Sequence, residues 1–350
     1  MIRYGTIGTN KITNEFIEAA TISRKWELTA VYADDAKDAQ AFADQQSAST
    51  AFSDLNTFLQ SDGLEAVFIA SSPIRHFEQI KRAIQADKHV IVQPPAVTNP
   101  TEFAAIEQLL ADHPDVRFFE AVYPLHMPNF ENVAATLATM PAIQGATFVA
   151  MRDLPGYDQV LAGQQPDGFT LASAGGALQI VGLYPLYAAL RLFGRPKKGS
   201  YFATAIQTGV DGLGAIFLEY PKFDVTLHIG ITTDSFMPSE IYGLHEKIVI
   251  DNITELKLIN HYDVDKQNNL LNTITYANRL TGEALAIGNV LENLNDPEQQ
   301  KQYASWLQLA RDVHTTLFHL RSMVGIKFPT DRSTAEDYPL MIAIIIKNGF

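Results

Sequence analysis

The chain has 350 residues, of which 47% are hydrophobic and 19% charged, with a formal net charge of −13 at pH 7. This length predicts two domains, and the acidic balance argues against nucleic acid or an anionic membrane surface as partners. The lack of cysteine excludes disulfides and thiolate metal sites, and together with the missing secretory signal and membrane span it predicts a cytoplasmic protein.

The chain begins with the pattern of a dinucleotide-binding βαβ unit. A short apolar strand over residues 2–7 leads into a turn at Gly8 and a predicted helix over residues 11–20. Unpartnered N–H groups and the positive dipole end make such a helix N-terminus a site for pyrophosphate. Of the Gly-x-Gly-x-x-Gly fingerprint only Gly8 is present, because Asn10 and Thr13 stand at the other two glycine positions. The residues expected to contact a dinucleotide here are Gly8, Thr9, Asn10 and Ile12.

Strand-like and helix-like segments alternate up to residue 121, which predicts a parallel sheet with crossover helices. The helix that follows Pro73 has apolar residues on one face only, typical of a helix that covers a sheet. The predicted strands after the first span residues 27–33, 65–70, 89–93 and 115–121. We therefore expect a Rossmann domain over residues 1–121.

The second domain, expected over residues 122–330, has a different pattern. Apolar residues alternate with others from Val225 to Ile231, which is typical of strands with one covered face. Gly212 and Gly214 are interpreted as a hairpin turn. Further strands are predicted over residues 146–151, 201–208, 215–220, 247–251 and 255–259, with a long helix over 298–323. The expected fold class is α/β, with an N-terminal Rossmann domain and a second, α+β domain that has a large, mostly antiparallel open sheet. The role of the tail, residues 331–350, is not assigned.

Asp34 follows the second strand, where such units place an acid that accepts hydrogen bonds from the adenosine ribose. A carboxylate there repels a 2′-phosphate, so we expect NAD rather than NADP as the cofactor. The alternative is that Asp34 is only the N-cap of the following helix. No spacing of histidines and carboxylates indicates a metal site.

An ordered set of motifs over about residues 2–330 resembles the Gfo/Idh/MocA oxidoreductases. Each motif alone is too short to indicate a family, and it is their occurrence in the same order along the chain that indicates it. The motifs are the Gly8 turn, the Ala-Ser-Ser-Pro turn before His76, the segment 89–95 that ends Gln93-Pro94-Pro95, Phe119-Glu120-Ala121, the segments 175–178 and 182–185, and the ending 325–329.

This resemblance implies a nicotinamide-binding Rossmann domain and a second domain whose open sheet forms an active-site wall and a homo-oligomer contact. It also implies hydride transfer between the cofactor and a sugar, polyol or related small hydroxylated substrate. Further cofactor contacts are then expected from the carboxyl edge of the first sheet. They are Ser71, Ser72, Pro73, His76, Gln93, Pro94 and Glu120.

Two catalytic positions of the family differ in this chain. The lysine of its Glu-Lys-Pro motif is replaced by Pro94, which has neither a titratable group nor a backbone N–H, and the aspartate of the second-domain motif is Ile180. Tyr184 then becomes a candidate for proton transfer, although a tyrosine in an apolar helix can equally be a wall residue. His126 is the other catalytic candidate, with a surface or hinge residue as its alternative.

Two functions follow. The first is an NAD-dependent oxidoreductase with altered acid–base chemistry. The second is a dinucleotide- or sugar-binding regulatory protein that has kept the fold and lost turnover. The two missing catalytic groups favour the second function. Retention of Glu120, His76 and the glycines around Gly176 favours the enzyme, because binding energy and hydride positioning still accelerate the reaction.

Overall fold

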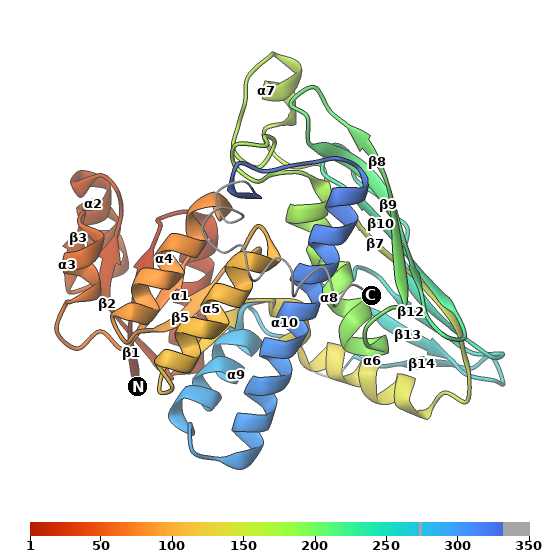
Figure 1. Ribbon diagram of the computed structural model, residues 1–350. Coiled ribbons are helices and arrows are strands. Elements are labelled where there is room, and N and C mark those ends of the chain that lie inside the picture. The colour runs from red at the N-terminus through yellow and green to blue at the C-terminus, as the bar shows by residue number, and fades with distance from the viewer. Residues whose placement is uncertain (273–274, 332–350) are drawn as a thin grey trace. The chain divides into compact units, whose positions relative to one another are not determined.

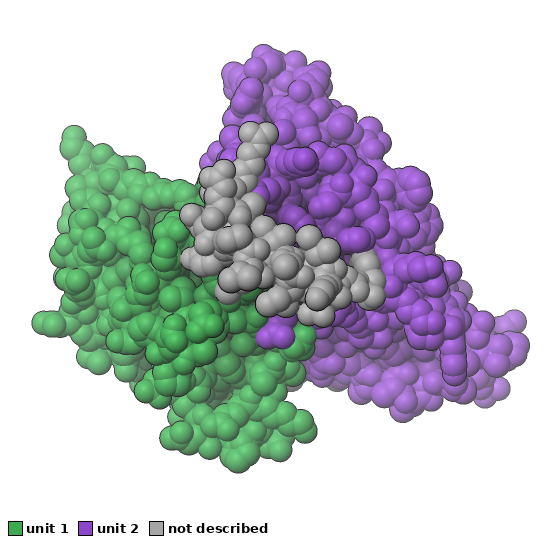
Figure 2. All heavy atoms as spheres, in the orientation of Figure 1, with its two compact units in different colours: residues 1–97, 102–123, 276–308 green, residues 98–101, 124–275, 309–350 purple. Residues whose placement is uncertain are grey.

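The computed structural model describes residues 1–272 and 275–331, which divide into two compact units (Figure 2). The first unit contains residues 1–97, 102–123 and 276–308, and the second contains residues 98–101, 124–275 and those from 309 on. Apart from Asp331, the expected tail and its apolar stretch, Met341–Ile346, lie outside the described residues. Among the helices that are described, none is long and apolar enough to cross a membrane.

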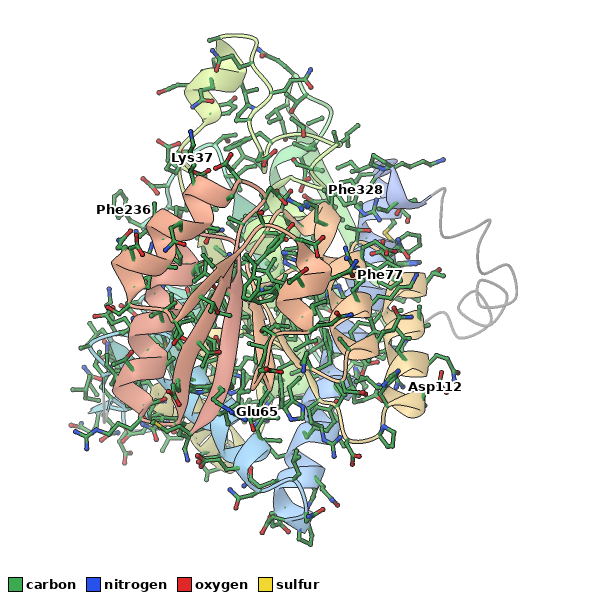
Figure 3. The ribbon with its side chains drawn as sticks, turned by 90° about the vertical axis from the view of Figure 1, so that its left-hand side faces the viewer. Lys37, Glu65, Phe77, Asp112, Phe236 and Phe328 are labelled. Atoms are coloured by element: carbon green, nitrogen blue, oxygen red, sulfur yellow. The ribbon has the colours of Figure 1, made fainter. Side chains whose placement is uncertain are left out.

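The first unit is built on a six-stranded parallel sheet with the order β3-β2-β1-β4-β5-β6 (Figure 1). This is the expected Rossmann sheet, and its central strands are apolar because helices cover both faces. In Figure 3, Lys37 lies near the carboxyl ends of these strands and Glu65 near the amino ends. The strands are β1 (Ile2–Ile7), β2 (Trp26–Tyr32), β3 (Thr50–Phe52), β4 (Ala66–Ile69), β5 (His89–Val92) and β6 (Phe118–Glu120). The helices between them are α1 (Lys11–Ser23), α2 (Ala36–Gln46), α3 (Leu55–Leu59), α4 (Pro73–Gln85) and α5 (Pro100–Asp112).

A segment from late in the chain completes the first unit, which differs from the expected domain boundaries. Helix α9 (Thr281–Glu292) packs on α1, and the indole N–H of Trp26 donates a hydrogen bond of 2.9 Å to the carbonyl oxygen of Ala284. Asn278 donates to the backbone oxygen of Glu15 at 2.8 Å. Residues 276–308 were expected in the second domain, but their buried apolar contacts are with the first sheet's helices and strands.

The second unit contains an eight-stranded sheet with the order β14-β13-β12-β11-β7-β10-β9-β8. Only β7 and β10 pair in parallel, so the expectation of a large, mostly antiparallel sheet is confirmed. The strands are β7 (Ile143–Met151), β8 (Lys198–Ala205), β9 (Asp211–Glu219), β10 (Asp224–Gly230), β11 (Ser239–Gly243), β12 (Lys247–Ile250), β13 (Ile259–Tyr262) and β14 (Asn268–Leu270). The helical elements are η1 (Tyr123–His126), which begins in the first unit, α6 (Pro128–Thr139), α7 (Tyr157–Leu161), η2 (Leu178–Gly182), α8 (Leu183–Phe193) and the long α10 (Pro297–Met323), whose residues to 308 belong to the first unit.

The two faces of this sheet differ in polarity. Val225, Leu227 and Ile229 of β10 are buried on the face that η2 and α8 cover, as their alternation predicts. On the opposite face Phe202 and Phe217 pack edge to face at 5.9 Å and are 66% and 46% exposed. One face therefore holds the core, and the other presents aromatic side chains to solvent.

Two local predictions for the second unit are wrong. Gly212 and Gly214 lie within β9, and the hairpin turn is at residues 206–210, where Ile206 and Val210 are bonded through their backbones. The glycines are needed because neighbouring side chains approach the strand closely, Ile206 at Gly212 and the ring of Tyr201 at Gly214. Residues 255–258 are not a strand. The side-chain oxygen of Asn252 accepts a hydrogen bond from the backbone N–H of Thr254, which starts a turn instead.

The Gly325-Ile-Lys-Phe-Pro ending surrounds a buried cation of the second unit. The guanidinium of Arg321, 2% exposed, donates to both carboxylate oxygens of Asp331 at 2.7 and 2.9 Å. It also donates to the carbonyl oxygens of Ile326 and Thr98, and it lies 4.0 Å from the ring centre of Phe328. The motif therefore has a structural role: its Ile326 carbonyl and Phe328 ring, together with Asp331 just beyond it, surround a charge that would be costly to bury alone.

Candidate functional site

The turn after β1 has the backbone geometry that close approach of a phosphate requires. Gly8 has φ +104°, and a Cβ there would lie 2.8 Å from the carbonyl oxygen of Ala70. Asn10 is the N-cap of α1, and its side-chain oxygen accepts a hydrogen bond from the backbone N–H of Thr13 at 3.2 Å. Its amide nitrogen donates to the carbonyl oxygen of Ala70 at 2.6 Å. The residue that replaces the second glycine thus joins this turn to the end of β4.

A buried histidine connects the next two strand ends. His76, 1% exposed on α4, has Nδ1 at 2.8 Å from the carbonyl oxygen of Pro95 and Nε2 at 3.0 Å from that of Ser71. Burial lowers the pKa of His76, while the two carbonyls and the charge of Glu120 oppose this effect. A neutral imidazole has one N–H and can donate to only one of these oxygens, whereas the cation donates to both, and in either form the ring lies between the segments that follow β4 and β5.

The remaining candidates of this unit lie at the same edge. Ser72 is the N-cap of α4 and Pro73 its first residue, and the Ser71 hydroxyl donates to the side-chain oxygen of Gln79 at 2.5 Å. The backbone N–H of Gln93 donates to Ile69 at 2.8 Å, which extends the pairing of β5 with β4. Glu120, at the end of β6, accepts a hydrogen bond of 2.7 Å from the backbone N–H of Ala96. Pro94 lies between Gln93 and Ala96, on the segment that these two bonds hold.

Asp34 lies at the end of β2, and its carboxylate forms a two-pronged ion pair with Arg75 of α4. The two nitrogen–oxygen distances are 2.5 and 2.8 Å, and the hydroxyl of Tyr32 donates to the same carboxylate at 2.9 Å. The hydrogen bonds from Arg75 are the main reason why the pKa of Asp34 falls to about 2. The alternative of Asp34 as a helix cap is wrong, because Asp35 caps α2 through the N–H groups of Lys37 and Asp38.

These residues fit a dinucleotide. The N–H groups of Lys11 and Ile12, in the first turn of α1, have no intrahelical acceptor and face the end of the helix. Gly8 adds no side chain to the turn before them, and Asp34 supplies a hydrogen-bond acceptor just after the adjacent strand, β2. The first unit therefore provides donors for a pyrophosphate and an acceptor for ribose hydroxyls.

Both catalytic candidates lie in the second unit. Tyr184 is partly exposed in the first turn of α8, next to η2, which is a π-helical segment. His126, at the end of η1, has its pKa lowered to about 4 by burial and by the positive charge of Arg191. The imidazole is therefore neutral near pH 7, so it can accept a proton but has none of its own to give from the cationic form.

A buried carboxylate that the sequence pattern did not predict lies behind the second-domain motif. Asp211, 2% exposed, accepts hydrogen bonds from the hydroxyl of Tyr201 at 2.5 Å and from the backbone N–H of Leu178 at 2.6 Å. Burial raises the pKa of Asp211, and these donors lower it. A Cβ at Gly176 would lie 2.2 Å from the Asp211 carboxylate, so the glycine at this position is what admits the Asp211 side chain. Asp211 stabilises the start of η2, and hence the segment that carries Tyr184.

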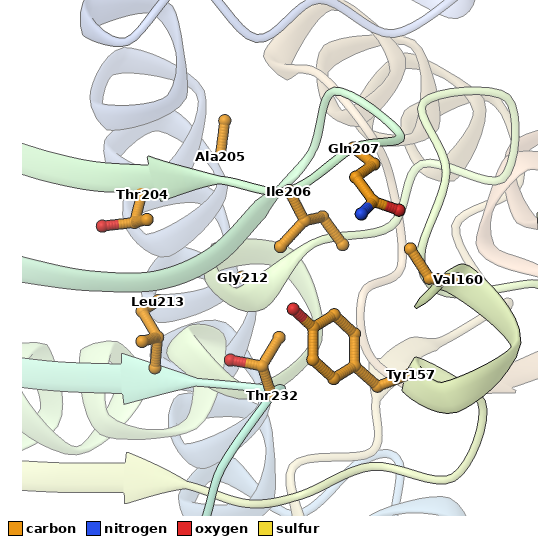
Figure 4. Close-up of a pocket in the computed structure, with 9 residues that line it drawn as sticks. All are labelled: Tyr157, Val160, Thr204, Ala205, Ile206, Gln207, Gly212, Leu213 and Thr232. Carbon is orange, nitrogen blue, oxygen red and sulfur yellow. The ribbon is translucent and has the colours of Figure 1, made fainter. Parts of the chain in front are cut away.

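The second unit also has a pocket of about 260 Å³ between α7 and the β8–β9 hairpin (Figure 4). Hydroxyls of Tyr157, Thr204 and Thr232 and the amide of Gln207 line it, beside Val160, Ile206 and Leu213. Among the described residues that line the pocket there is no carboxylate, imidazole or ammonium group, so these residues offer hydrogen bonds without an acid or base near neutral pH. Over the ranges that the structure describes, no three carboxylates or imidazoles are grouped as a metal site.

Two of the missed residues could have been found from the sequence. Arg75 is a cation directly before His76, in the first turn of the helix that follows a central strand, and Asp211 is an acid with no other acid near it in the sequence. In both cases the sequence does not identify the partner. The pairing of Arg75 with Asp34 requires that β1 lie between β2 and β4, which only the sheet order shows.

Comparison with known proteins gives one family. Residues 2–121 match the GFO_IDH_MocA family, described as an oxidoreductase family with an NAD-binding Rossmann fold. The chain is 31% identical over 332 residues to the uncharacterized oxidoreductase YgjR of Escherichia coli. This alignment covers 95% of this chain and 99% of that protein. It is 36% identical over 256 residues to the NADP-dependent scyllo-inositol 2-dehydrogenase IolU of Bacillus subtilis, over 72% of this chain and 77% of that protein.

Among solved structures, the fold is similar to that of a 3-ketoreductase from Actinomadura kijaniata in complex with TDP-benzene and NADP. The TM-score is 0.77 at 17% identity, and the match covers 92% of this chain and 97% of that chain. This likeness extends over both units and concerns the fold alone.

Proposed function

The chain belongs to the Gfo/Idh/MocA family of NAD(P)-dependent oxidoreductases, and we propose that it transfers a hydride between a nicotinamide dinucleotide and a sugar, polyol or related small hydroxylated substrate. One observation carries the proposal. The Gly8 turn, the N-terminus of α1 and Asp34 lie together at the carboxyl edge of a parallel sheet, where open α/β sheets bind their ligands. The dehydrogenase names of relatives that act on an inositol and on xylose support the substrate class.

The bound nicotinamide supplies the hydride acceptor or donor, so the protein has to orient the substrate carbon and move one proton. When an alcohol is oxidised, the C–H bond breaks with its electron pair, and the hydroxyl proton needs a base. Pro94 has no titratable group, so we assign this proton transfer to Tyr184: its phenol gives a proton to the carbonyl oxygen when a ketone is reduced, and the resulting phenolate takes the hydroxyl proton back in the reverse direction. His126 is the second candidate, because burial and the charge of Arg191 keep its imidazole neutral.

We propose that the first unit accepts NADP as well as NAD. The expectation of NAD alone came from the negative charge of Asp34, and Arg75 neutralises that charge at distances of 2.5 and 2.8 Å. Named relatives and a similar structure carry NADP, which agrees with a site that tolerates the 2′-phosphate.

The test is titration of the purified protein with NAD(H) and NADP(H), followed by a panel of sugars and polyols read as nicotinamide absorbance. We expect micromolar binding of a dinucleotide and turnover of at least one neutral polyol or sugar. Tyr184→Phe should lower kcat by about 100-fold or more and leave the dinucleotide Kd unchanged. Tight binding without turnover over a broad panel would instead favour the regulatory protein, and failure to bind either dinucleotide would overturn both functions.

We also propose that copies of the chain associate through the open face of the eight-stranded sheet. The exposed pair Phe202 and Phe217 supports this, because aromatic side chains gathered on one sheet face mark contact surfaces. Light scattering should give a mass above 38.7 kDa, and Phe217→Lys should shift it toward the monomer. A cytoplasmic location stays a prediction.

A further inference from the structure

The ion pair of Asp34 and Arg75 spans the end of a strand and remains exposed to solvent, so stabilising the fold does not explain it. The two residues come from elements at the ends of β2 and β4, and β1 lies between these strands in the sheet. The pair therefore reaches across the end of β1, above the turn that begins at Gly8. Both side chains remain open to solvent, 62% for Asp34 and 45% for Arg75. Ion pairs this exposed contribute little to stability.

The ion pair leaves hydrogen-bond donors of Arg75 and acceptor positions of Asp34 unused. A guanidinium has five N–H donors, and Asp34 accepts from two of them. A carboxylate has about four acceptor positions, and two N–H groups of Arg75 and the hydroxyl of Tyr32 occupy three. Arg75 thus has more free capacity than Asp34.

Because the chain is acidic, the unused N–H donors of Arg75 matter for binding a phosphate group. With a net charge of −13, the overall field of the protein repels a phosphate group, so a local cation or a helix terminus is needed to bind one. The N-terminus of α1 is the place for the pyrophosphate. Arg75 is a cation at the position where the adenosine ribose would meet Asp34, and a planar guanidinium matches the geometry of a phosphate.

We propose that Arg75 is the residue that selects between the two dinucleotides: it binds the 2′-phosphate of NADP through N–H groups that Asp34 leaves free, while Asp34 accepts a ribose hydroxyl of NAD. This inference rests on the proposed dinucleotide function. Arg75 keeps the acid from repelling NADP, and Asp34 keeps Arg75 directed at the ribose position when no phosphate is bound.

The experiment measures binding by calorimetry for NAD, NADP and the fragment 2′,5′-ADP, with 5′-ADP as the fragment without the second phosphate. Arg75→Gln should weaken NADP and 2′,5′-ADP by about tenfold or more, and NAD and 5′-ADP by less than about threefold. Asp34→Asn should change the preference in the opposite direction, toward NADP. Higher salt should weaken NADP more than NAD in the wild type and equally in Arg75→Gln.

Arg3→Gln is the matched control, because Arg3 pairs with Glu65 at 3.2 Å at the amino end of the same sheet, with 48% and 46% exposure. It should leave all four affinities unchanged. If Arg75→Gln weakens NAD and NADP equally, or neither, Arg75 is an adenine contact or a surface residue and the inference is overturned while the proposed function stands. If the wild type binds no dinucleotide, the proposed function fails first and the inference with it.

Discussion

The side-chain amide of Asn10 donates a hydrogen bond of 2.6 Å to the carbonyl oxygen of Ala70, which connects the turn after β1 to the end of β4. The same side chain caps α1 through Thr13. A residue that departs from the glycine fingerprint therefore performs two structural tasks, and these tasks can be separated by substitution.

Asn10→Ala removes both the cap and the tether, and we expect it to lower the free energy of unfolding by about 2 kcal/mol. Asn10→Asp keeps the capping oxygen, so it should cost less stability. Its negative charge lies beside the expected pyrophosphate, however, so it should weaken dinucleotide binding more than Asn10→Ala. Urea unfolding and dinucleotide titration measure the two effects. The same ranking of the two variants in both measurements would contradict this account.

Gly176→Ala should destabilise the second unit strongly. The glycine has φ +112°, and an added Cβ would lie 2.2 Å from the carboxylate of Asp211, which then loses its bonds to Tyr201 and Leu178. We expect a loss of at least about 3 kcal/mol, since backbone strain and a displaced buried acid add together.

Gly194→Ala separates these two contributions. Gly194 has φ +77° and ψ −166° and no atom within 4 Å of an added Cβ, so only the backbone strain of about 1–3 kcal/mol should appear. If thermal unfolding shows the same loss of stability for the two variants, the contact with Asp211 does not contribute to the stability of the protein.

Glu283 makes the stability of the folded chain depend on pH. The side chain is 1% exposed on α9, its Oε2 has no partner among the described residues, and burial raises its pKa from 4.5 to about 8. The folded protein then holds a proton that the unfolded chain releases near pH 4.5, so stability falls as pH rises from about 4.5 to about 8. Glu283→Gln should remove this loss and raise the unfolding free energy above pH 8 by up to about 4 kcal/mol.

Urea unfolding at pH 5 and pH 8.5 tests whether the free energy of unfolding falls as the pH rises. The gain from Glu283→Gln should be small at pH 5 and large at pH 8.5. Glu292→Gln on the same helix is the control, because Glu292 is 37% exposed beside Lys25, and it should shift both curves alike. A gain that is the same at both pH values would exclude Glu283 as the titrating group.

Asp331→Ala should leave the guanidinium of Arg321 buried without its carboxylate, at a cost of about 3–5 kcal/mol. Glu131→Ala is a suitable comparison, because Glu131 and Arg191 form a pair at 3.3 Å that is 58% and 40% exposed. That change should cost less than about 1 kcal/mol. Denaturant midpoints of the two variants test the difference, and a loss below 1 kcal/mol for Asp331→Ala would contradict the role given to the motif.

Much of the first unit follows from local sequence alone. The strand over residues 2–7, the turn at Gly8 and the alternation up to residue 121 determine a parallel sheet, because period, turn residues and helix faces all act over short distances. Local pattern also identified the covered face of β10. It failed at Gly212 and Gly214, since a glycine required by a neighbouring side chain looks the same in sequence as a glycine required by a turn.

What only the tertiary structure decided is the pairing of residues that are distant in the chain. The sequence by itself determined that Asp34 follows a strand and that Pro94 cannot replace a lysine. It could not show that Arg75 neutralises Asp34, that Asp211 lies against Gly176, or that residues 276–308 complete the first unit. Each of these depends on which strands are neighbours and which side chains are excluded from water, and burial and charge pairing are properties of the folded chain.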